Sequence, residues 1–351
     1  MALQDSEAPP GQEPLLSVDG LRVTFGSGSN TVTAVDGVTF DVHPGETLGI
    51  VGESGSGKSV SVMSLLGLAA GNVVGGTATF EGKDLLSMSK REMRAVRGKS
   101  IAMVFQDAMT ALNPVLTIGN QLTEALTIHA PMSASAARDR ALELLRTVGV
   151  PNAEARLKQY PHEYSGGMRQ RAMIAMAMAN KPRLLIADEP TTALDVTIQA
   201  QVLDVLRRAK EETGAATILI THDLGVVAEM ADRVVVMYSG QVVETGTVEQ
   251  VFRRPSHPYT LGLLRSLPRL DGRTTRLLPI RGNPPSARAQ PTGCRFHPRC
   301  DLAAGRSLCS EQTPDLLLSA EGTRARCHFL DEVPAFRAAT TVGAPGSEVQ
   351  P

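Results

Sequence analysis

Residues 47–59 read Thr-Leu-Gly-Ile-Val-Gly-Glu-Ser-Gly-Ser-Gly-Lys-Ser. The first five residues form a short apolar run that predicts a buried strand, and residues 60–68 beyond the stretch predict a helix. Between them, residues 52–59 match the pattern of a phosphate-binding loop, in which four residues separate the first glycine from Gly-Lys-Ser. Because strand, loop and helix occur in this order, the stretch predicts an α/β fold built around a nucleotide loop.

The chemistry of this loop follows from its residue types. Glycines let the backbone wrap around phosphate groups, Lys58 supplies charge at the β- and γ-phosphates, and the Ser59 hydroxyl reaches Mg²⁺. A glycine-rich turn that matches the pattern by chance is the alternative, but the strand, the Lys-Ser pair and the helix all agree. We predict that the nucleotide contacts of this loop are Gly52, Ser54, Gly55, Ser56, Gly57, Lys58 and Ser59.

An apolar run at residues 184–187 ends in two carboxylates, Asp188 and Glu189. Phosphoryl transfer needs a metal-bound carboxylate and a group that orients the attacking water. We expect Asp188 to hold Mg²⁺ through water and Glu189 to polarise the attacking water. An ordinary acidic turn after a strand is the alternative, which the preceding phosphate loop disfavours.

A second anion site is predicted at residues 164–171, which read Tyr-Ser-Gly-Gly-Met-Arg-Gln-Arg. A Ser-Gly-Gly turn that opens a helix points free backbone N–H groups and a positive helix end at an anion. We therefore expect Ser165, Gly166 and Gly167 to contact phosphate. Two anion sites in one chain indicate an ATPase that closes over ATP together with a partner.

Composition excludes several functions. The chain has 351 residues, 42 % hydrophobic and 20 % charged, which suits two globular domains. Its formal net charge of -1 and its 3 % aromatic residues give no support for nucleic-acid binding. No apolar run approaches about 18 residues, and the acidic, polar N-terminus differs from a signal peptide, so we expect a cytosolic protein.

The chain divides by composition and periodicity. Strands are predicted at residues 15–25 and 31–42, and a hairpin is predicted across Ser239-Gly240. Helical spacing predicts helices at residues 118–128 and 134–148, with Ser133 or Ser135 as the cap of the second. Proline, arginine and glycine increase after about residue 265. The expected divisions are a flexible leader at 1–14, an ATPase domain at 15–262 with a helical part at about 107–182, a C-terminal domain at 263–331 and a flexible tail at 332–351.

Six motifs in this order resemble the ABC-transporter ATPases over roughly residues 15–260. They are the phosphate loop, Gln106, Ser165-Gly166-Gly167, Asp188-Glu189, Leu194-Asp195 and His222. The resemblance implies a RecA-like core, an antiparallel β subdomain and a helical subdomain. It also implies ATP and Mg²⁺ as cofactors.

The resemblance implies further roles. Phe25 lies where the family places an aromatic ring against adenine, although simple strand core explains it nearly as well. Gln106 matches the family's loop that contacts Mg²⁺ and relays the state of the nucleotide site to the transporter. Asp195 matches the loop between the two ATPases, and His222 matches the histidine that contacts the γ-phosphate. We thus expect Glu189, His222 and Gln106 to be catalytic. The expected Mg²⁺ ligands are Ser59, Gln106 and Asp188.

Two residues depart from the family pattern. Many members have Leu and Gln where this chain has Tyr164 and Met168. Since Met lacks the hydrogen-bond donors of Gln, the substitution is expected to affect the strength of this half-site.

Residues 253–268, 282–285 and 293–300 resemble the C-terminal extension of oligopeptide and dipeptide importer ATPases, much of which nickel importers share. This branch implies peptide import, with nickel or another small solute as the alternative. The implied partners are a second, usually different, ATPase chain, two membrane permeases that dock on the helical region 107–160, and an external peptide-binding protein. The implied location is peripheral, on the cytoplasmic face of the plasma membrane.

All four cysteines lie between residues 294 and 327, separated by five, eight and seventeen residues. Zinc ribbons favour tighter pairs, so this spacing fits a Cys₄ iron–sulfur cluster better. The resemblance also implies a [4Fe–4S] cluster, with Zn²⁺ and four unliganded thiols as alternatives; His297 and His328 are less favoured ligands. The predicted ligands are Cys294, Cys300, Cys309 and Cys327.

The sequence disfavours two other functions. A soluble ATPase acting on DNA or ribosomes is disfavoured, since residues 60–187 contain no coiled-coil pattern and the chain has one ATPase unit. A redox sensor built around the cysteines is disfavoured by the complete set of ATP motifs. The cargo cannot be deduced from residues that never touch it.

Overall fold

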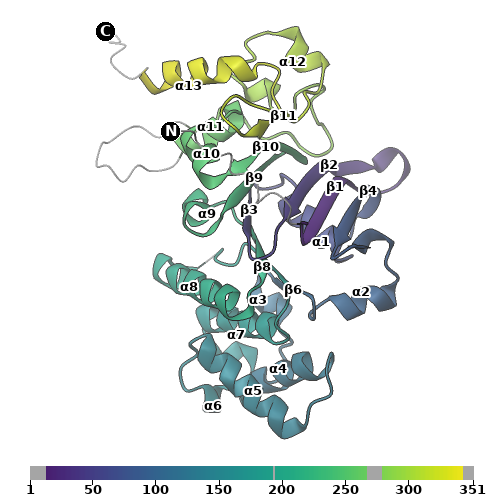
Figure 1. The fold of residues 1–351 in the computed structure, drawn as a ribbon, viewed down its shortest axis with the longest axis vertical. Helices are drawn as coiled ribbons and strands as arrows, with labels where there is room; N and C mark the ends of the chain where they lie inside the picture. Colours follow the sequence, from purple (N-terminus) through teal and green to yellow (C-terminus); the bar gives the residue numbers. More distant parts are fainter. Residues whose placement is uncertain (1–12, 193, 267–278, 343–351) are drawn as a thin grey trace.

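A computed structural model describes residues 13–192, 194–266 and 279–342, and its strands form two sheets (Figure 1). One is a core sheet of eight strands, and the other is an antiparallel sheet of four strands. The predicted α/β class, with a β subdomain beside the core, is confirmed.

The middle of the core sheet is parallel, in the order β9-β3-β8-β7-β6. Its central strands β3, β7 and β8 are buried along their whole length, as expected for apolar runs covered on both faces. Parallel strands end at the same edge, so the phosphate loop after β3 and the carboxylates at the end of β7 lie near each other. These strands are β3 (Thr47–Val51), β6 (Ile101–Val104), β7 (Leu184–Asp188), β8 (Ala216–Ile220) and β9 (Arg233–Tyr238).

The antiparallel sheet has the order β2-β1-β4-β5 and lies beside the core sheet, with α1 between them (Figure 1). Leu16, Val35, Ile50 and Leu65 from both sheets and α1 belong to one buried apolar cluster. The elements here are β1 (Leu16–Phe25), η1 (Gly28–Asn30), β2 (Val32–Val42), α1 (Lys58–Leu65), β4 (Asn72–Phe80), β5 (Lys83–Asp84), η2 (Leu85–Ser87) and α2 (Lys90–Val96).

Helices at the far end of the molecule form the expected helical part (Figure 1). Both long helices are confirmed, and the Ser133 side chain caps the second by accepting from the Ala136 N–H. Their apolar faces, with Leu122 and Leu144 fully buried, share one core with α7. The elements are α3 (Ala108–Ala111), α4 (Ile118–Thr127), α5 (Ala134–Thr147), α6 (Ala153–Arg156), η3 (Pro161–Glu163) and α7 (Gly166–Met178).

The predicted hairpin across Ser239-Gly240 is confirmed, because β9 pairs antiparallel with β10. After β7 the chain continues through α8 (Val196–Thr213), α9 (Leu224–Met230), β10 (Gln241–Thr247), α10 (Val248–Arg253) and α11 (Pro258–Arg265).

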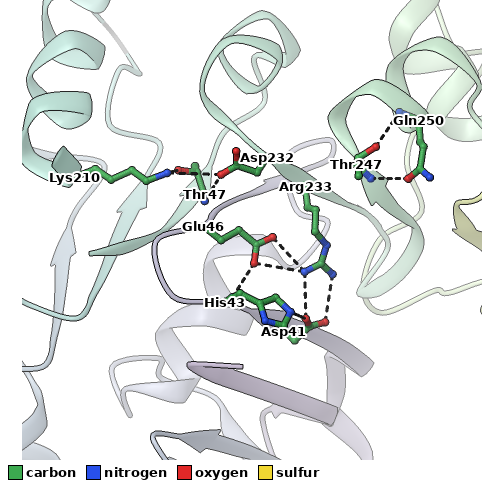
Figure 2. A network of polar contacts seen from close by, with 9 residues as sticks. All are labelled: Asp41, His43, Glu46, Thr47, Lys210, Asp232, Arg233, Thr247 and Gln250. Carbon is green, nitrogen blue, oxygen red and sulfur yellow. Dashed lines mark hydrogen bonds and ion pairs between the residues drawn. The ribbon is translucent and has the colours of Figure 1, made fainter. Parts of the chain in front are cut away.

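A polar network ties the two sheets together near the start of β3 (Figure 2). Arg233, which starts β9, lies 3.2 Å from Asp41 of β2 and 3.2 Å from Glu46 before β3. Although burial raises the pKa of Asp41, the hydrogen bond and charge of Arg233 lower it overall. The Lys210 ammonium of α8 donates to the Thr47 hydroxyl at 2.7 Å, so the network also holds a helix.

The C-terminal module continues the core sheet. Strand β12 pairs antiparallel with β10, matching Ala325 to Glu244, and β11 pairs with β12. The module is therefore joined to the ATPase part by backbone hydrogen bonds between strands. Its elements are η4 (His297–Arg299), α12 (Ser307–Glu311), β11 (Leu317–Leu318), β12 (Arg324–Ala325), η5 (Leu330–Glu332) and α13 (Val333–Val342).

The predicted tail at 332–351 is partly wrong, because residues 333–342 form helix α13. Val333 is fully buried, and the Arg337 guanidinium donates to the Pro255 carbonyl and to Glu321, which fixes the helix on the module. Residues 343–351, and residues 1–12 of the predicted leader, lie outside the described residues.

Candidate active site

Two glycines determine the shape of the phosphate loop. Gly52 has φ of 154°, and a Cβ there would lie 2.2 Å from the Met237 carbonyl oxygen. Gly57, which caps α1, has φ of 97°, and a Cβ would lie 2.8 Å from the Ala34 carbonyl oxygen. No larger residue fits at either position, so the backbone of the loop is held tightly against its neighbours.

Lys58 and Ser59 make the polar contacts at the start of α1. The Lys58 ammonium donates to the carbonyl oxygens of Gly52 at 2.9 Å and Glu53 at 3.1 Å. The Ser59 hydroxyl donates to Asp188 Oδ1 at 2.7 Å. Burial lowers the pKa of Lys58 and raises that of Asp188. A serine hydroxyl and a carboxylate side by side are oxygen ligands suited to Mg²⁺.

Three polar side chains lie close to the Glu189 carboxylate. Its Oε2 accepts from Gln106 Nε2 at 3.0 Å and from the Thr192 hydroxyl at 2.9 Å, and it lies 3.6 Å from Nδ1 of His222. Glu189 has φ of 44°, a left-handed conformation that is strained for a side chain of this kind. The three residues predicted to be catalytic therefore meet at one carboxylate.

These side chains surround a cavity of about 540 Å³. Gly52 and Asp188 do not line the cavity, but each is bonded to a residue that does. The Gly52 carbonyl accepts from Lys58, and the Asp188 carboxylate accepts from Ser59. Both a nucleotide phosphate group and Mg²⁺ find matching donors and oxygen ligands here. The cavity is lined by Ser54, Gly55, Ser56, Gly57, Lys58, Ser59, Val60, Gln106, Glu189 and His222.

The other predicted nucleotide contacts lie outside the lining of this cavity. Phe25, at the end of β1, is half-buried and packs on the apolar cluster between the sheets. Ser165 caps α7, and Asp195 caps α8 by accepting from the Ile198 N–H at 3.0 Å. The structure thus assembles the phosphate and carboxylate motifs within the chain and leaves the Ser-Gly-Gly turn apart from them.

Known proteins resemble this chain closely. Residues 35–192 match the family model "ABC transporter", and residues 243–309 match "Oligopeptide/dipeptide transporter, C-terminal region". The dipeptide transport ATP-binding protein DppD of Bacillus subtilis is 50 % identical over 323 residues, covering 91 % of this chain and 96 % of that protein. The oligopeptide transport ATP-binding protein OppD of Salmonella typhimurium is 50 % identical over 310 residues, covering 88 % and 92 %.

The chain belongs to the ABC transporter ATPases, in their oligopeptide/dipeptide branch. It is therefore an ATP-hydrolysing subunit with ATP and Mg²⁺ as cofactors. Among solved structures, the dimeric ATP-binding cassette MJ0796 bound to ADP and Pi is 28 % identical, with a TM-score of 0.61, and covers 66 % of this chain and 98 % of that one. In the described part of this ABC ATPase, no helix is long and apolar enough to cross a membrane.

Gly167 of this ABC ATPase has a packing role that its motif did not predict. A Cβ at Gly167 would lie 2.6 Å from Cγ2 of Ile198, so α7 approaches α8 more closely than any side chain allows. At Gly166 a Cβ would meet only Cδ2 of Leu194, at 3.7 Å, which is an ordinary contact. The two glycines of one motif therefore serve different purposes.

The two residues that depart from the family pattern face inward. Tyr164 is 3 % exposed, its hydroxyl donates to the Arg156 carbonyl at 3.0 Å, and burial raises its pKa to about 12. Met168 is half-buried against the helical core, while its N–H donates to Ser165 Oγ at 3.4 Å. Tyr164 thus anchors the start of α7 to α6.

The four cysteines are free thiols that line one pocket with His297 and His328. Burial raises the pKa of the Cys300 thiol to about 11 and that of Cys327 to about 12. Nδ1 of His297 bonds to the Cys294 carbonyl and Nε2 of His328 to the Gln312 carbonyl, so both rings are engaged elsewhere.

The predicted metal centre is not supported by this arrangement. Within residues 13–192, 194–266 and 279–342, no three His, Cys, Asp or Glu side chains are grouped as a metal ion requires. The pocket that the thiols share is also lined by apolar side chains, among them Phe296, Leu302 and Ala303. Neither the [4Fe–4S] cluster nor Zn²⁺ is therefore confirmed.

Several contacts of the phosphate loop were not predicted. Arg299 of the C-terminal module forms two hydrogen bonds to the Glu53 carboxylate, at 2.7 and 3.1 Å. The Glu53 N–H donates to the Tyr259 hydroxyl at 2.9 Å. The contact of Thr192 with Glu189 could have been inferred, because the two residues are only three positions apart. Nothing in the sequence pairs residue 299 with residue 53.

Proposed function

We propose that this chain hydrolyses ATP to drive the import of peptides through a membrane transporter. A complete phosphate and carboxylate cavity and an oligopeptide-type C-terminal region in one chain carry the proposal. The chain aligns with its relatives over nearly their whole length, and those relatives are named for dipeptide and oligopeptide transport.

Each site residue has a proposed role in the reaction. The loop from Ser54 to Ser59 cradles the phosphates, with Lys58 at the β- and γ-phosphates and Gly52 shaping the turn. Bound Mg²⁺ neutralises phosphate charge, and Ser59, Asp188 and Gln106 are its proposed ligands. Glu189 orients the attacking water, His222 contacts the γ-phosphate, and hydrolysis needs no covalent intermediate.

The remaining predicted residues are proposed to act across an interface between two ATPases. Ser165 and Gly166 are exposed at the start of α7, and Asp195 is exposed at the start of α8. A phosphate held by another chain completes such an open helix start. We propose that the Ser165-Gly166-Gly167 turn and Asp195 serve ATP on a second, different ATPase, and that Phe25 stacks on adenine.

The proposed assembly contains two ATPases, two permeases and an external peptide-binding protein. The chain lies peripherally on the cytoplasmic face of the plasma membrane, with the helical segment 107–160 as the permease contact. Nucleic acid has no part in this function.

Transport measurements test the function. The chain, copurified with its permeases and partner ATPase, is reconstituted in vesicles with the binding protein, and ATP-driven accumulation of labelled peptides and of nickel is compared. We expect accumulation of peptides. Accumulation of nickel without peptides overturns the peptide assignment, and absence of ATP hydrolysis by the intact complex overturns the ATPase assignment.

A second proposal is that the four thiols bind a [4Fe–4S] cluster, with Zn²⁺ as the alternative. Its support is that all four cysteines line one pocket as free thiols. Binding requires the sulfur atoms to approach one another and to lose their protons. Anaerobic purification with visible absorption and metal analysis decides: iron with sulfide supports the cluster, while stoichiometric zinc without iron, or neither metal, overturns it.

A further inference from the structure

A single segment of the C-terminal module, residues 294–300, reaches the phosphate loop by three routes. It reads Cys-Arg-Phe-His-Pro-Arg-Cys and includes the short helix η4. Its Arg299, Arg295 and Phe296 side chains each contact a residue that touches the loop.

Arg299 makes the most direct contact. Two guanidinium nitrogens donate to the two carboxylate oxygens of Glu53, at 2.7 and 3.1 Å, and the Arg299 side chain is only 6 % exposed. The same guanidinium donates to the Arg281 carbonyl at 2.8 Å and to the Tyr238 hydroxyl at 3.3 Å. A shielded, bidentate charged pair with a fixed arginine holds Glu53 in one orientation.

Arg295 supports the loop through the β9–β10 turn. Its guanidinium donates to the Ser239 carbonyl and to the Asp36 carboxylate. The next residue in the turn, Gly240, donates its N–H to the Ser56 carbonyl at 2.9 Å. The turn is thus held between the C-terminal module and the phosphate loop.

Phe296 supports the loop through an aromatic cluster. Its ring centroid lies 5.3 Å from that of Tyr238 and 5.4 Å from that of Tyr259. The Tyr259 hydroxyl, fully buried, accepts from the Glu53 N–H at 2.9 Å. The side chain and the backbone of Glu53 are therefore both fixed from outside the strand–loop–helix unit.

We propose that Arg299 is a positioning residue for ATP binding, which acts through Glu53 on the conformation of the phosphate loop. Glu53 does not line the cavity, but its carbonyl oxygen accepts from the Lys58 ammonium at 3.1 Å. A loop held in its binding conformation gives tighter binding than one that must be ordered first. The proposal rests on the ATPase function proposed above.

The test compares two arginine–glutamate pairs in the same module. Arg299→Gln breaks the pair with the loop, and Arg306→Gln breaks the bidentate Arg306–Glu332 pair, at 3.0 and 2.8 Å, which does not touch the loop. In the assembled transporter, Arg299→Gln should raise the KM for ATP about tenfold and leave kcat within about twofold, since the carboxylate and Mg²⁺ ligands are untouched. Arg306→Gln should leave both unchanged.

A double-mutant cycle identifies Glu53 as the intermediary. Glu53→Gln should raise the KM to the same degree as Arg299→Gln, and the double variant should raise it no further. Independent, multiplying effects overturn the proposal. So does a wild-type KM in Arg299→Gln, or an equal rise in Arg306→Gln.

A second variant keeps the proposal testable if the first one does not fold. If Arg299→Gln does not assemble, Arg299→Lys replaces it, since lysine keeps the charge but not the paired geometry, and its KM for ATP should rise about threefold. An unchanged KM in that variant overturns the proposal. Inactive wild-type transporter would instead contradict the ATPase function itself, so the two failures are distinguishable.

Discussion

The hydroxyl of Ser59 donates a 2.7 Å hydrogen bond to the carboxylate of Asp188, although 129 positions separate the two residues in the chain. Ser59 is the second residue of α1, which follows the loop after β3. Asp188 is the last residue of β7, which is separated from β3 in the sheet by β8. Burial raises the pKa of Asp188, and the serine bond offsets part of that effect. The hydrogen bond brings two of the proposed Mg²⁺ ligands into direct contact.

Replacement of Ser59 by Ala should therefore weaken the response to Mg²⁺. We expect the Mg²⁺ concentration for half-maximal hydrolysis to rise about tenfold, because one oxygen ligand and one partner of Asp188 are lost. A Mg²⁺ titration of phosphate release measures this. Ser87→Ala, on η2 and outside the lining of the cavity, is the control, and an unchanged Mg²⁺ requirement in Ser59→Ala would refute the assignment.

Glu189→Gln should separate binding from hydrolysis. Glutamine keeps the shape beside Gln106 and Thr192 but cannot polarise water as a carboxylate does, so turnover should fall at least about 100-fold. ATP affinity, measured with a fluorescent nucleotide, should stay near the wild-type value. Near-normal turnover in this variant would mean that another group positions the water.

Gly167→Ala should destabilise the helical part. Its Cβ would lie 2.6 Å from Ile198 Cγ2, and forcing α7 away from α8 should cost about 1–3 kcal/mol in the free energy of unfolding. Denaturant unfolding of the full chain measures the loss. Addition of Ile198→Ala, which removes that methyl group, should recover part of it.

Gly166→Ala is the matched control for this experiment. Its Cβ has a 3.7 Å contact with Leu194 and φ outside the left-handed region, so stability should change by less than about 0.5 kcal/mol. Equal destabilisation by both alanines would contradict the packing role of Gly167.

Glu244 and His257 should oppose each other in the pH dependence of stability. Both are buried, and the Glu244 carboxylate accepts from the backbone N–H of His257 at 3.0 Å. Burial raises the pKa of Glu244 from 4.5 to about 7 and lowers that of His257 from 6.5 to about 3. The stability from Glu244 is full below pH 4.5 and is lost toward pH 7, whereas that from His257 is full above pH 6.5 and is lost toward pH 3.

Between pH 4.5 and 6.5 each slope is about 1.4 kcal/mol per pH unit, and they nearly cancel. Glu244→Gln should therefore make the free energy of unfolding rise with pH in this window, and His257→Asn should make it fall. Urea unfolding at several pH values measures both slopes. Identical slopes in the wild type and both variants would contradict this account.

Local patterns predicted the ATPase part of the fold well. The runs before Gly52 and Asp188 have the length and composition of buried parallel strands, and both form them. The resemblance to ABC-transporter ATPases implied catalytic roles for Gln106, Glu189 and His222, and their side chains meet because β6, β7 and β8 end side by side in one sheet. Periodicity and motif context sufficed wherever short-range signals and sheet topology agree.

Long-range contacts of the C-terminal module could not be predicted. Its strands are two residues each, too short to produce an alternating pattern, and the bond from Arg299 to Glu53 joins residues with no local signal. The helix at Val333–Val342 was missed because tertiary contacts of Val333 and Arg337, not composition, stabilise it. Cysteine clustering predicted a metal centre; the four thiols line one pocket, but the described residues contain no grouping of side chains that would hold a metal ion.

The pairing of β10 with β12 has a consequence for biosynthesis. A ribosome delivers Glu53 and its glycine-rich loop 246 positions before it delivers Arg299, and β12 emerges later still. The nascent ATPase therefore has a nucleotide loop without its arginine until Arg299 is made, and from the synthesis of β10 until that of β12 it also has an uncovered strand edge. A product that terminates before β12 therefore exposes a sheet edge of the kind that chaperones and proteases recognise.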